Sequence, residues 1–358
     1  MYIAGIDAHS SYLVVAIVSK SGELLERRRV RVGEPKRLSE LLAKYRPLTV
    51  VVETSSAWPW IHDLLVPQGI SFVLAHARRL RLIAESSYKS DEVDAELIAR
   101  MHLAGLIPAV YPKSPEQREW SRLIRHRASL VRKRTAMANQ IHGQLHQVGL
   151  SIARGKLLTR EGVRWLREEA DPHLAEEQKR LIRTHLKLIA TMRPMIRGLD
   201  RRIEEVCEGI PVTRLLRTVP GIGAYRALLI AAECLPIERF RSASEFVSYC
   251  GLAPVTRSTG GKTRHGSLPK GANRWLRGAM VRTVVSHFQQ APESWLGRYY
   301  EAQKARLGWP VARIATARKL CRALHAMLRN DSSWQNEIER TERGELRRMA
   351  AETTAPTL

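Results

Sequence analysis

Two short apolar runs in the first sixty residues restrict the possible folds most strongly. Residues 2–7 read "YIAGID" and residues 48–55 read "LTVVVETS", and the runs end in the acids Asp7 and Glu53. Apolar, β-branched runs of this length predict strands that are buried on both faces of a sheet. Together with the helical segments between them, the runs predict an α/β domain in which each of these two strands ends in an acid.

The segments around these strands add a specific element order. Residues 11–19 and 22–32 predict two more strands, with Ser21-Gly22 as the hairpin turn between them. The other predicted elements are a helix at 35–45, a helix at 58–69 ended by Gly69, a strand at 70–76 and a helix at 90–105 with Ser90 as N-cap. Three hairpin-like strands, then helix, strand, helix, strand and helix, is the order of the ribonuclease H architecture.

Four acids of this predicted domain can meet at one point. In a ribonuclease H arrangement the strands that end in Asp7 and Glu53 are central neighbours, so the two carboxylates converge. Asp91 and Asp94 lie three residues apart on the last helix, share one of its faces and can join them. Clustered carboxylates repel one another, and a divalent cation with a preference for oxygen ligands, Mg²⁺ or Mn²⁺, relieves that repulsion. Such a site can hold two metal ions ~4 Å apart and stabilise in-line displacement at phosphorus.

Each acid alone also has an ordinary interpretation. Asp7 can be a turn former, Glu53 a solvated loop residue, and Asp91 an acid that favours a helix N-terminus. All four in this order, in an otherwise basic protein, favour the metal site. Glu92 and Glu96, on the same predicted helix, are interpreted as solvated helix surface.

The charge of the chain is large and uneven. The net charge is +24 over 358 residues, yet residues 1–110 carry 14 Lys and Arg against 12 Asp and Glu, a net of +2, which leaves +22 for the remaining 248. A block this basic predicts a polyanionic partner, nucleic acid rather than a membrane surface. No apolar run reaches membrane-spanning length and the N-terminus lacks a signal-peptide pattern, so a cytoplasmic, nucleoid-associated protein is expected. Four widely spaced cysteines form no metal-ligand pair and are expected to be reduced core residues.

Beyond Pro115 the pattern becomes helical. Residues 115–149 predict one long helix with near-heptad apolar spacing, and residues 174–209 predict a second, which suggests an antiparallel pair or an oligomeric coiled coil. Seven Lys and Arg fall between Arg118 and Arg134 against one acid, so we predict nucleic-acid contacts there rather than only a solvated face. The residues predicted to make these contacts are Arg125, Arg132, Lys133 and Arg134.

Two further motifs point to phosphate binding. Residues 219–223 read "VPGIG" between two helical stretches, a helix-hairpin-helix pattern in which Gly221 and Gly223 would let backbone N–H groups approach a phosphate; the alternative is an ordinary tight turn. Ser258 lies in a Gly-rich, basic loop that can wrap a phosphate, and composition alone favours a serine that only hydrogen-bonds it over a serine that attacks it. The predicted phosphate-binding residues of this region are Arg257, Thr259, Gly260, Lys262, Arg264, Lys270 and Arg274.

At this point the chain resembles a known family over nearly all of residues 1–330. The motifs, in family order, are "GIDAHSSYLVVAIV", "VVVETSSAW", "KSDEVDAELIA", "VPGIGAYRALLIAAE" and "YCGLAPVTRSTGGKTRHGSLPKGANRWLR". They resemble those of the IS110-family transposases, including the IS1111-like group, whose studied members are bridge-RNA-guided recombinases. Thr259 stands where family members often carry Ser or Ala, and Ser258 is the only serine of the loop before the glycines.

The resemblance implies a fold, a chemistry and partners. It implies a RuvC-like domain at 1–112 with Asp7, Glu53, Asp91 and Asp94 as its DEDD acids, a coiled-coil segment at 113–210, and a transposase domain at 211–332 with Ser258 as nucleophile. Beyond the resemblance, the charged composition of residues 333–358 predicts a mobile tail. It further implies recombination through a covalent 5′-phosphoserine DNA intermediate with Mg²⁺, in a tetramer whose serine comes from another protomer. A structured non-coding RNA would pair with donor and target DNA.

Two alternatives remain open at this level. The chain could be a RuvC-like junction nuclease, in which a metal-bound water attacks and Ser258 only binds phosphate. It could also be a non-catalytic RNA- and DNA-binding scaffold, although clustered carboxylates in a phosphate groove argue against a pure binder.

Overall fold

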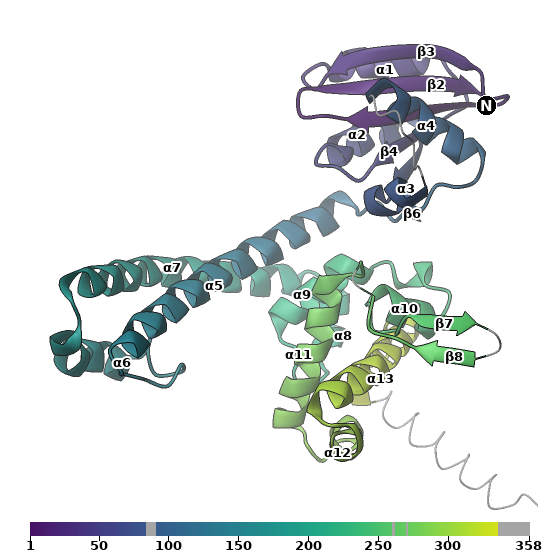
Figure 1. Ribbon diagram of the computed structural model, residues 1–358. Coiled ribbons are helices and arrows are strands. Elements are labelled where there is room, and N and C mark those ends of the chain that lie inside the picture. The colour runs from purple at the N-terminus through teal and green to yellow at the C-terminus, as the bar shows by residue number, and fades with distance from the viewer. Residues whose placement is uncertain (84–90, 260–261, 270, 336–358) are drawn as a thin grey trace, which may run out of the picture. The chain divides into compact units, whose positions relative to one another are not determined.

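The computed structural model describes residues 1–83, 91–259, 262–269 and 271–335, with side chains described at 1–80, 94–255, 266–269 and 271–335. The chain divides into two compact units between Pro115 and Glu116 (Figure 1). Among the described helices, none combines the length and apolar character that a membrane span requires. The predicted boundary at residue 112 lies three residues from this division, and the predicted boundary at 210 stays a prediction.

A six-stranded mixed sheet forms the centre of the first unit, in the order β3-β2-β1-β4-β5-β6. Its strands are β1 (Tyr2–Ala8), β2 (Tyr12–Ser19), β3 (Leu24–Arg31), β4 (Leu48–Glu53), β5 (Ser71–Ala75) and β6 (Ala109–Val110). β1 pairs antiparallel with β2 and parallel with β4, which in turn pairs parallel with β5. The two apolar runs are therefore central neighbours, as the ribonuclease H order predicts, and the unit is RuvC-like.

Helices cover both faces of this sheet. They are α1 (Pro35–Ala43), α2 (Trp58–Leu65), the 3₁₀ turn η1 (Val66–Gln68), α3 (Ala77–Ile83) and α4 (Asp91–Leu103). Alternate residues of β1 divide between the two cores, because Ala4 and Ile6 pack with α1 and α2, whereas Ile3 packs with residues of α3 and α4. The face of the sheet that carries the odd-numbered β1 residues is therefore the α4 face.

Three details of the predicted first domain need correction or limitation. Residues 77–83 form helix α3 and residues 109–110 form the short strand β6, and neither element is among those predicted. Gly22 and Gly69 lie at φ +86° and +73°, which confirms both predicted turns. Ser90, the predicted N-cap, lies outside the described residues, and the helix is described from Asp91.

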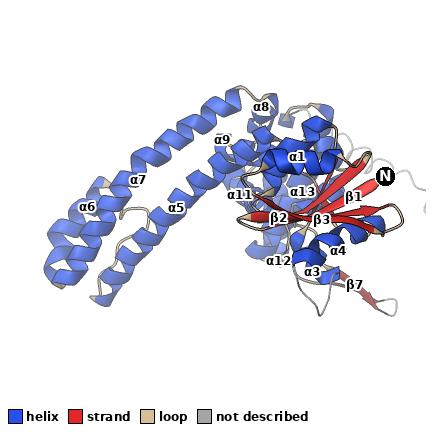
Figure 2. Cartoon of the chain, turned by 90° about the horizontal axis from the view of Figure 1, so that it is seen from above, coloured by secondary structure: helices blue, strands red, loops and turns tan. Residues whose placement is uncertain are grey.

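The second unit begins with two long helices that lie side by side. α5 (Pro115–Gln147) and α7 (Glu176–Glu208) have 33 residues each and run antiparallel, with α6 (Arg160–Trp165), η2 (Leu166–Ala170) and η3 (Asp171–His173) at their far end (Figure 2). Ile141 and Leu145 of α5 share a buried core with Ile182 and Ile189 of α7. The predicted helix pair is confirmed, whereas the turns at 160–173 were not predicted.

The rest of the second unit is helical except for one hairpin. Its elements are α8 (Pro211–Arg217), α9 (Ala224–Cys234), η4 (Ile237–Arg239), α10 (Ala243–Tyr249), β7 (Thr256–Thr259), β8 (Lys262–His265), α11 (Arg274–Gln290), α12 (Trp295–Leu307) and α13 (Trp309–Asn330). These helices share a large core of their own, into which Ile203 and Cys207 at the end of α7 also pack. All four cysteines are buried and free, as the sequence predicts.

The start of the predicted tail is more ordered than expected. Trp334 is 4% exposed, its backbone N–H donates to Thr218 Oγ1 at 3.0 Å, and its ring lies 5.7 Å from that of His287. The indole of Trp334 therefore packs on the core of the second unit, within the predicted tail at 333–358, whose mobility stays a prediction. Residues 336–358 lie outside the described part of the chain.

Candidate active site

Asp7 and Glu53 lie at corresponding positions on adjacent strands. β1 and β4 are parallel with Ile6 opposite Val52, so Asp7 and Glu53 occupy the next position on each strand. Asp7 alternates in phase with Ile3, and Glu53 with Val51; Ile3 and Val51 both belong to the core on the α4 face. Because side chains two residues apart on a strand share a face, both carboxylates belong to the α4 face at one edge of the sheet.

Gly5 brings α4 unusually close to this edge. A Cβ atom built on Gly5 would lie 2.0 Å from the Ala95 carbonyl oxygen and 2.8 Å from the Ala99 backbone nitrogen. The backbone of α4 therefore packs directly on the backbone of β1, two residues before Asp7. No other residue type fits there without moving the helix.

Of the two helix acids, Asp94 borders the stripe of α4 that faces the sheet. Ala95, Ile98 and Ala99 are buried, and Asp94 precedes Ala95 directly with a half-buried side chain. Asp91 lies one turn earlier, seven residues before Ile98, and its side chain is outside the described residues. The fold thus places Asp7 and Glu53 at neighbouring strand ends, and Asp94 directly before Ala95, the residue whose carbonyl packs against Gly5.

His9 is a member of this site that the sequence analysis missed. Its Nε2 atom lies 2.9 Å from Asp7 Oδ2, and its ring packs 4.8 Å from that of Tyr12, over which the Arg29 guanidinium lies at 4.4 Å. The spacing Asp-x-His at a strand end was the available signal, because it puts both side chains on one face.

The donor set of the site fits a hard cation, although the described side chains do not yet enclose one. Carboxylate oxygens are the ligands that Mg²⁺ and Mn²⁺ prefer. Within the described residues no three Asp, Glu, His or Cys side chains are gathered at ligand distance of a common point, and Asp7 bonds His9. Asp7, Glu53 and Asp94 are the described residues that would hold a metal ion, with Asp91 as the fourth.

Glu96 corrects the interpretation of its helix as plain surface. Its side chain is 19% exposed and accepts hydrogen bonds from Arg27 of β3 and, at 2.8 Å, from Arg100 of α4. Burial alone would raise the pKa of this carboxyl, but the bonds from Arg100 and Arg27 hold it below its usual value. Glu96 therefore ties the helix that carries Asp94 to the edge strand. The side chain of Glu92 lies outside the described residues.

The Ser258 segment, predicted as a loop, is a β-hairpin. β7 and β8 pair antiparallel, with Ser258 opposite Thr263, Arg257 opposite Arg264, and Thr259 opposite Lys262. Thr256, Thr259 and Thr263 favour the extended backbone of the two strands, and Gly260-Gly261 lie between them in the sequence. Gly260 and Lys270 lie outside the described residues, and Arg274 is an exposed residue at the start of α11.

Polar and steric contacts hold the base of this hairpin. The Val255 backbone N–H donates to the Ser267 carbonyl oxygen at 3.1 Å, and the Gly266 N–H donates to the Val255 carbonyl oxygen at 2.7 Å. Gly251 adopts φ +70°, and a Cβ there would lie 2.4 Å from Ala272 Cβ and 2.6 Å from the Arg277 guanidinium. The Arg277 guanidinium in turn donates to the Pro269 carbonyl. Both ends of the hairpin are thereby fixed to the N-terminal part of α11.

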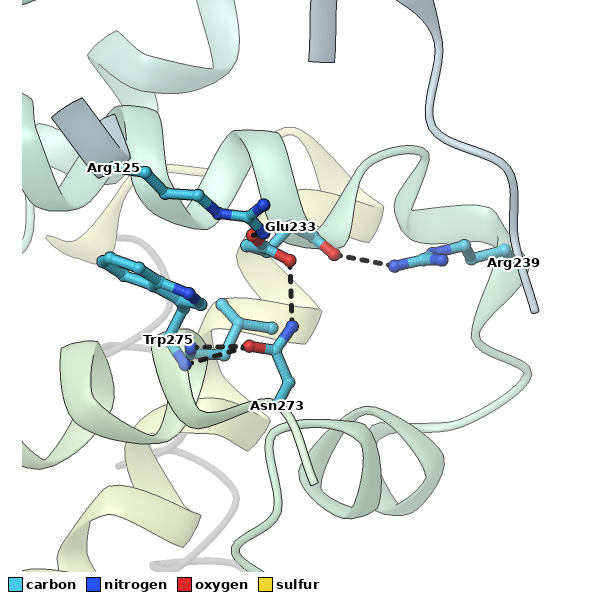
Figure 3. Close-up of polar contacts among 6 residues, drawn as sticks. Arg125, Glu233, Arg239, Asn273 and Trp275 are labelled. Carbon is cyan, nitrogen blue, oxygen red and sulfur yellow. Dashed lines mark hydrogen bonds and ion pairs between the residues drawn. The ribbon is translucent and has the colours of Figure 1, made fainter. Parts of the chain in front are cut away.

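A buried glutamate organises the same region (Figure 3). Glu233 of α9 is 6% exposed; its Oε2 accepts from Asn273 Nδ2 at 2.9 Å and its Oε1 lies 3.3 Å from the Arg125 guanidinium. Asn273 Oδ1 caps α11 by accepting from the N–H groups of residues 275 and 276, both at 3.1 Å. Arg239 donates to the Glu233 carbonyl oxygen at 2.8 Å. A lone acid in the apolar stretch "ALLIAAEC" was the sequence signal for a buried, paired charge.

Some of the basic residues of helix α5 are buried in the second unit or paired with its acids. Arg118 is 7% exposed, Arg125 pairs with Glu233, and Arg127 lies 2.8 Å from Asp200 and 4.9 Å from the Tyr225 ring. Among the other predicted nucleic-acid contacts, Arg132 is exposed with its guanidinium 6.0 Å from the Trp275 ring, Lys133 is exposed and Arg134 is half-buried.

The two glycines of the helix-hairpin-helix differ. Gly221, at φ +89°, packs on α11, where a Cβ would lie 2.7 Å from the His287 backbone nitrogen, so packing alone requires it. Gly223 has open space beside it and precedes α9 directly. Both glycines line a cavity of about 790 Å³, whose charged lining includes Arg201, Arg217 and Arg226 as well as Asp200 and Glu204. Of the two, Gly223 is the one whose surroundings suit an incoming phosphate.

Comparisons with known proteins show which proteins this chain resembles. A family model described as "Transposase", that of the DEDD type of IS110, matches residues 4–149, and a model described as "Transposase IS116/IS110/IS902 family" matches residues 213–301. The transposase for insertion sequence element IS1328 of Yersinia enterocolitica is 26% identical and the match covers 89% of this chain and 94% of that protein. The transposase for IS1111A of Coxiella burnetii is 23% identical, with 93% and 91% covered. Thermus thermophilus RuvC, solved with a Holliday junction, matches 31% of this chain and 99% of its own at 18% identity and a TM-score of 0.26.

A RuvC-like sheet with acids at the ends of its central strands, followed by a helical region, is the arrangement of a DEDD transposase. The chain belongs to the IS116/IS110/IS902 family of transposases.

Proposed function

We propose that this transposase recombines an insertion sequence with its target DNA through a covalent serine intermediate, assisted by Mg²⁺ at the acidic site. The observation that carries the proposal is the placement of Asp7 and Glu53 on adjacent strand ends, with Asp94 brought to the same edge by Gly5. This arrangement suits metal-assisted displacement at phosphorus, because carboxylates from separate elements can hold a cation against a phosphate.

In the proposed step the Ser258 hydroxyl attacks the scissile phosphorus. The Oγ–P bond forms as the hydroxyl loses its proton, the P–O3′ bond breaks, and the 3′ oxygen leaves as a hydroxyl after gaining a proton. The product is a 5′-phosphoserine, which a free 3′-hydroxyl of the partner strand reverses by the same chemistry. Mg²⁺, when bound, would supply positive charge to the phosphate oxygens. The hairpin residues Arg257, Thr259, Lys262 and Arg264 would bind those oxygens, with Gly260, Lys270 and Arg274 beside them.

The partners follow from charge and from the family. A net charge of +22 beyond residue 110 supports contact with long phosphate backbones, and we assign this contact to α5 at Arg125, Arg132, Lys133 and Arg134 and to the turn at Gly221 and Gly223. We further propose donor and target DNA duplexes, a bridge RNA that selects both, and a tetramer in which Ser258 serves the acidic site of another protomer.

A covalent trap tests the chemistry. The protein is incubated with Mg²⁺ and a nicked DNA site, and attached DNA is detected on a denaturing gel. We expect the adduct with the unaltered protein and with Thr259→Ala, and its loss with Ser258→Ala, with Asp7→Ala and on chelation of the metal.

Other outcomes identify the alternatives. If the DNA is cleaved without forming an adduct, and this cleavage persists in Ser258→Ala but is lost in Asp7→Ala, the protein is a junction nuclease in which water attacks. Binding without cleavage in every variant would indicate a scaffold. The guide is tested separately by sequencing the RNA that copurifies with the protein, where the absence of a discrete species would contradict the RNA-guided part.

A further inference from the structure

The hairpin of helices α12 and α13 carries a charge excess that no predicted site uses. Residues 295–330 hold eight Lys and Arg and a single acid, Glu301. Glu301 is already paired with Lys304 at 3.1 Å. The hairpin therefore presents a net charge of +7 in a part of the chain that lies outside the acidic site, the Ser258 hairpin and α5.

The turn between α12 and α13 also exposes large apolar side chains. Gly308, at φ +75°, joins the two helices, and around it Leu307 is 40%, Trp309 56% and Val311 52% exposed. In the same unit Trp334 is 4% exposed. An indole left more than half in water, at a turn where smaller residues would serve, indicates a surface that contacts something else.

Cations lie directly on the aromatic rings of the hairpin. The Arg313 guanidinium is 4.0 Å from the centroid of the Trp309 ring. Further along, Lys319 Nζ lies 4.2 Å from the Tyr299 ring and 4.9 Å from the Trp295 ring. Arg306, beside the turn, is exposed and donates to the neutral amide of Gln303. Charge and aromatic surface are thus combined within the same few turns of helix.

This combination fits an unpaired nucleotide better than a protein or a duplex. A flat exposed indole stacks on a base of any identity, and neighbouring cations hold the phosphates on either side. A duplex presents its phosphates but keeps its base faces covered by stacking. A protein partner would bury the apolar turn, but it would have to match a surface of +7 that a polyanion matches directly.

We propose that the turn Leu307–Arg313 is a stacking site for unpaired bases of a single-stranded nucleic acid, with Trp309 as the platform and Arg306 and Arg313 as phosphate contacts. The site is independent of the serine chemistry proposed above, because it requires only binding. It gives this unit a way to distinguish unpaired from paired nucleic acid.

Binding of labelled oligonucleotides to the full chain tests the site. Fluorescence anisotropy is measured with oligo(U) and oligo(dT) of about 15 nucleotides and with a duplex of equal length. We expect Trp309→Ala and Trp309→Leu to raise Kd for the single strands about fivefold or more, because each removes one base–aromatic stack. Trp309→Phe should raise Kd less, because it keeps a ring. Kd for the duplex should stay within about twofold, since stacking contributes nothing there. Arg313→Gln should lower the salt dependence of single-strand binding by about 0.7 in log–log slope.

Val311→Ala is the matched control, because Val311 is as exposed as Trp309 but offers no ring. Circular dichroism checks that each variant is folded. If Trp309→Ala binds both oligo(U) and oligo(dT) more weakly, the platform accepts either strand type. If only one of them binds more weakly, the site is assigned to RNA or to DNA accordingly. Unchanged single-strand binding in Trp309→Ala, or an equal loss for the duplex, would overturn the proposal. The proposal would also be overturned if Trp309→Ala and Val311→Ala both changed the oligomeric mass measured by light scattering. That result would indicate that the turn is a protein interface.

Discussion

The acidic site and the Ser258 hairpin are held in place by different forces. Asp7 and Glu53 sit on strands fixed by backbone hydrogen bonds and buried apolar residues, and α4 reaches them because Gly5 has no side chain. The hairpin base is fixed by polar side chains, namely Arg277 on the Pro269 carbonyl and Asn273 on the buried Glu233. One site is positioned by steric fit and the other by charge and hydrogen bonding, so substitutions should damage them in different ways.

The largest effect should come from Gly5→Ala. The new methyl group would overlap the Ala95 carbonyl, so α4 must move away from β1 and take Asp94 from Asp7. Overpacking of this kind costs about 1–3 kcal/mol of unfolding free energy. DNA cleavage should fall by about a hundredfold, because catalytic groups misplaced by ~1 Å lose that much. Urea unfolding and a cleavage assay measure the two effects.

Gly33→Ala is the matched control for this prediction. A Cβ on Gly33 meets no atom within 4 Å, and the residue belongs to the same unit. It should leave stability and cleavage nearly unchanged. If Gly5→Ala cleaved DNA as well as Gly33→Ala does, close packing of α4 would not be what positions the acids.

Gly251→Ala should produce a smaller loss, confined to the hairpin. The residue adopts φ +70°, which disfavours a side chain by about 1–2 kcal/mol, and the methyl group would also press on Ala272 and Arg277. We expect the covalent DNA adduct to decrease while metal binding at the acidic site is retained, as judged by calorimetric titration with Mn²⁺. Gly271→Ala, where a Cβ meets no atom within 4 Å, should preserve the adduct. If Gly251→Ala also lost metal binding, the Ser258 hairpin and the acidic site could not be disturbed independently of each other.

Glu233→Ala probes the charge-based side of the comparison. Removal of this acceptor leaves the half-buried Asn273 amide without its partner, whereas the half-exposed Arg125 can turn to water, and the unfolding free energy should fall by about 1–3 kcal/mol. Glu233→Gln keeps an acceptor for Asn273 and should lose less. The control is Glu205→Gln, an exposed partner of Arg202, which should change stability by at most about 1 kcal/mol. Equal losses for Glu233→Gln and Glu205→Gln would show that burial of Glu233 adds nothing.

The acidic site was more predictable from the sequence than the Ser258 hairpin, because local patterns encode strand ends but not the polar contacts between distant residues. The strand-end positions of Asp7 and Glu53 follow from local apolar pattern and element order, so the acidic edge was predictable. The contact of Gly5 with Ala95 joins residues ninety positions apart, and no local pattern encodes it. The Ser258 hairpin was not predictable in the same way, because its strands have only four residues each and lack an apolar pattern, and the glycines between them indicate a loop. Its supports, Glu233 and Asn273, come from separate helices that only the tertiary fold brings together.

The smallest expected effect concerns His287, which links the turn at Gly221 to α12. Its Nδ1–H donates to the Pro220 carbonyl at 2.9 Å and its Nε2 lies 2.7 Å from Ser294 Oγ. Burial lowers the pKa of His287 from 6.5, and the bond to Pro220 offsets only part of this. The unfolded chain therefore binds the proton more readily, so stability is complete above pH 6.5 and is lost as the pH falls below it. His287→Gln should reduce the slope of unfolding free energy against pH in this acidic range, by at most about 1.4 kcal/mol per pH unit. Urea unfolding between neutral pH and about two units below tests this, and equal slopes for both proteins would show that His287 is not the titrating group.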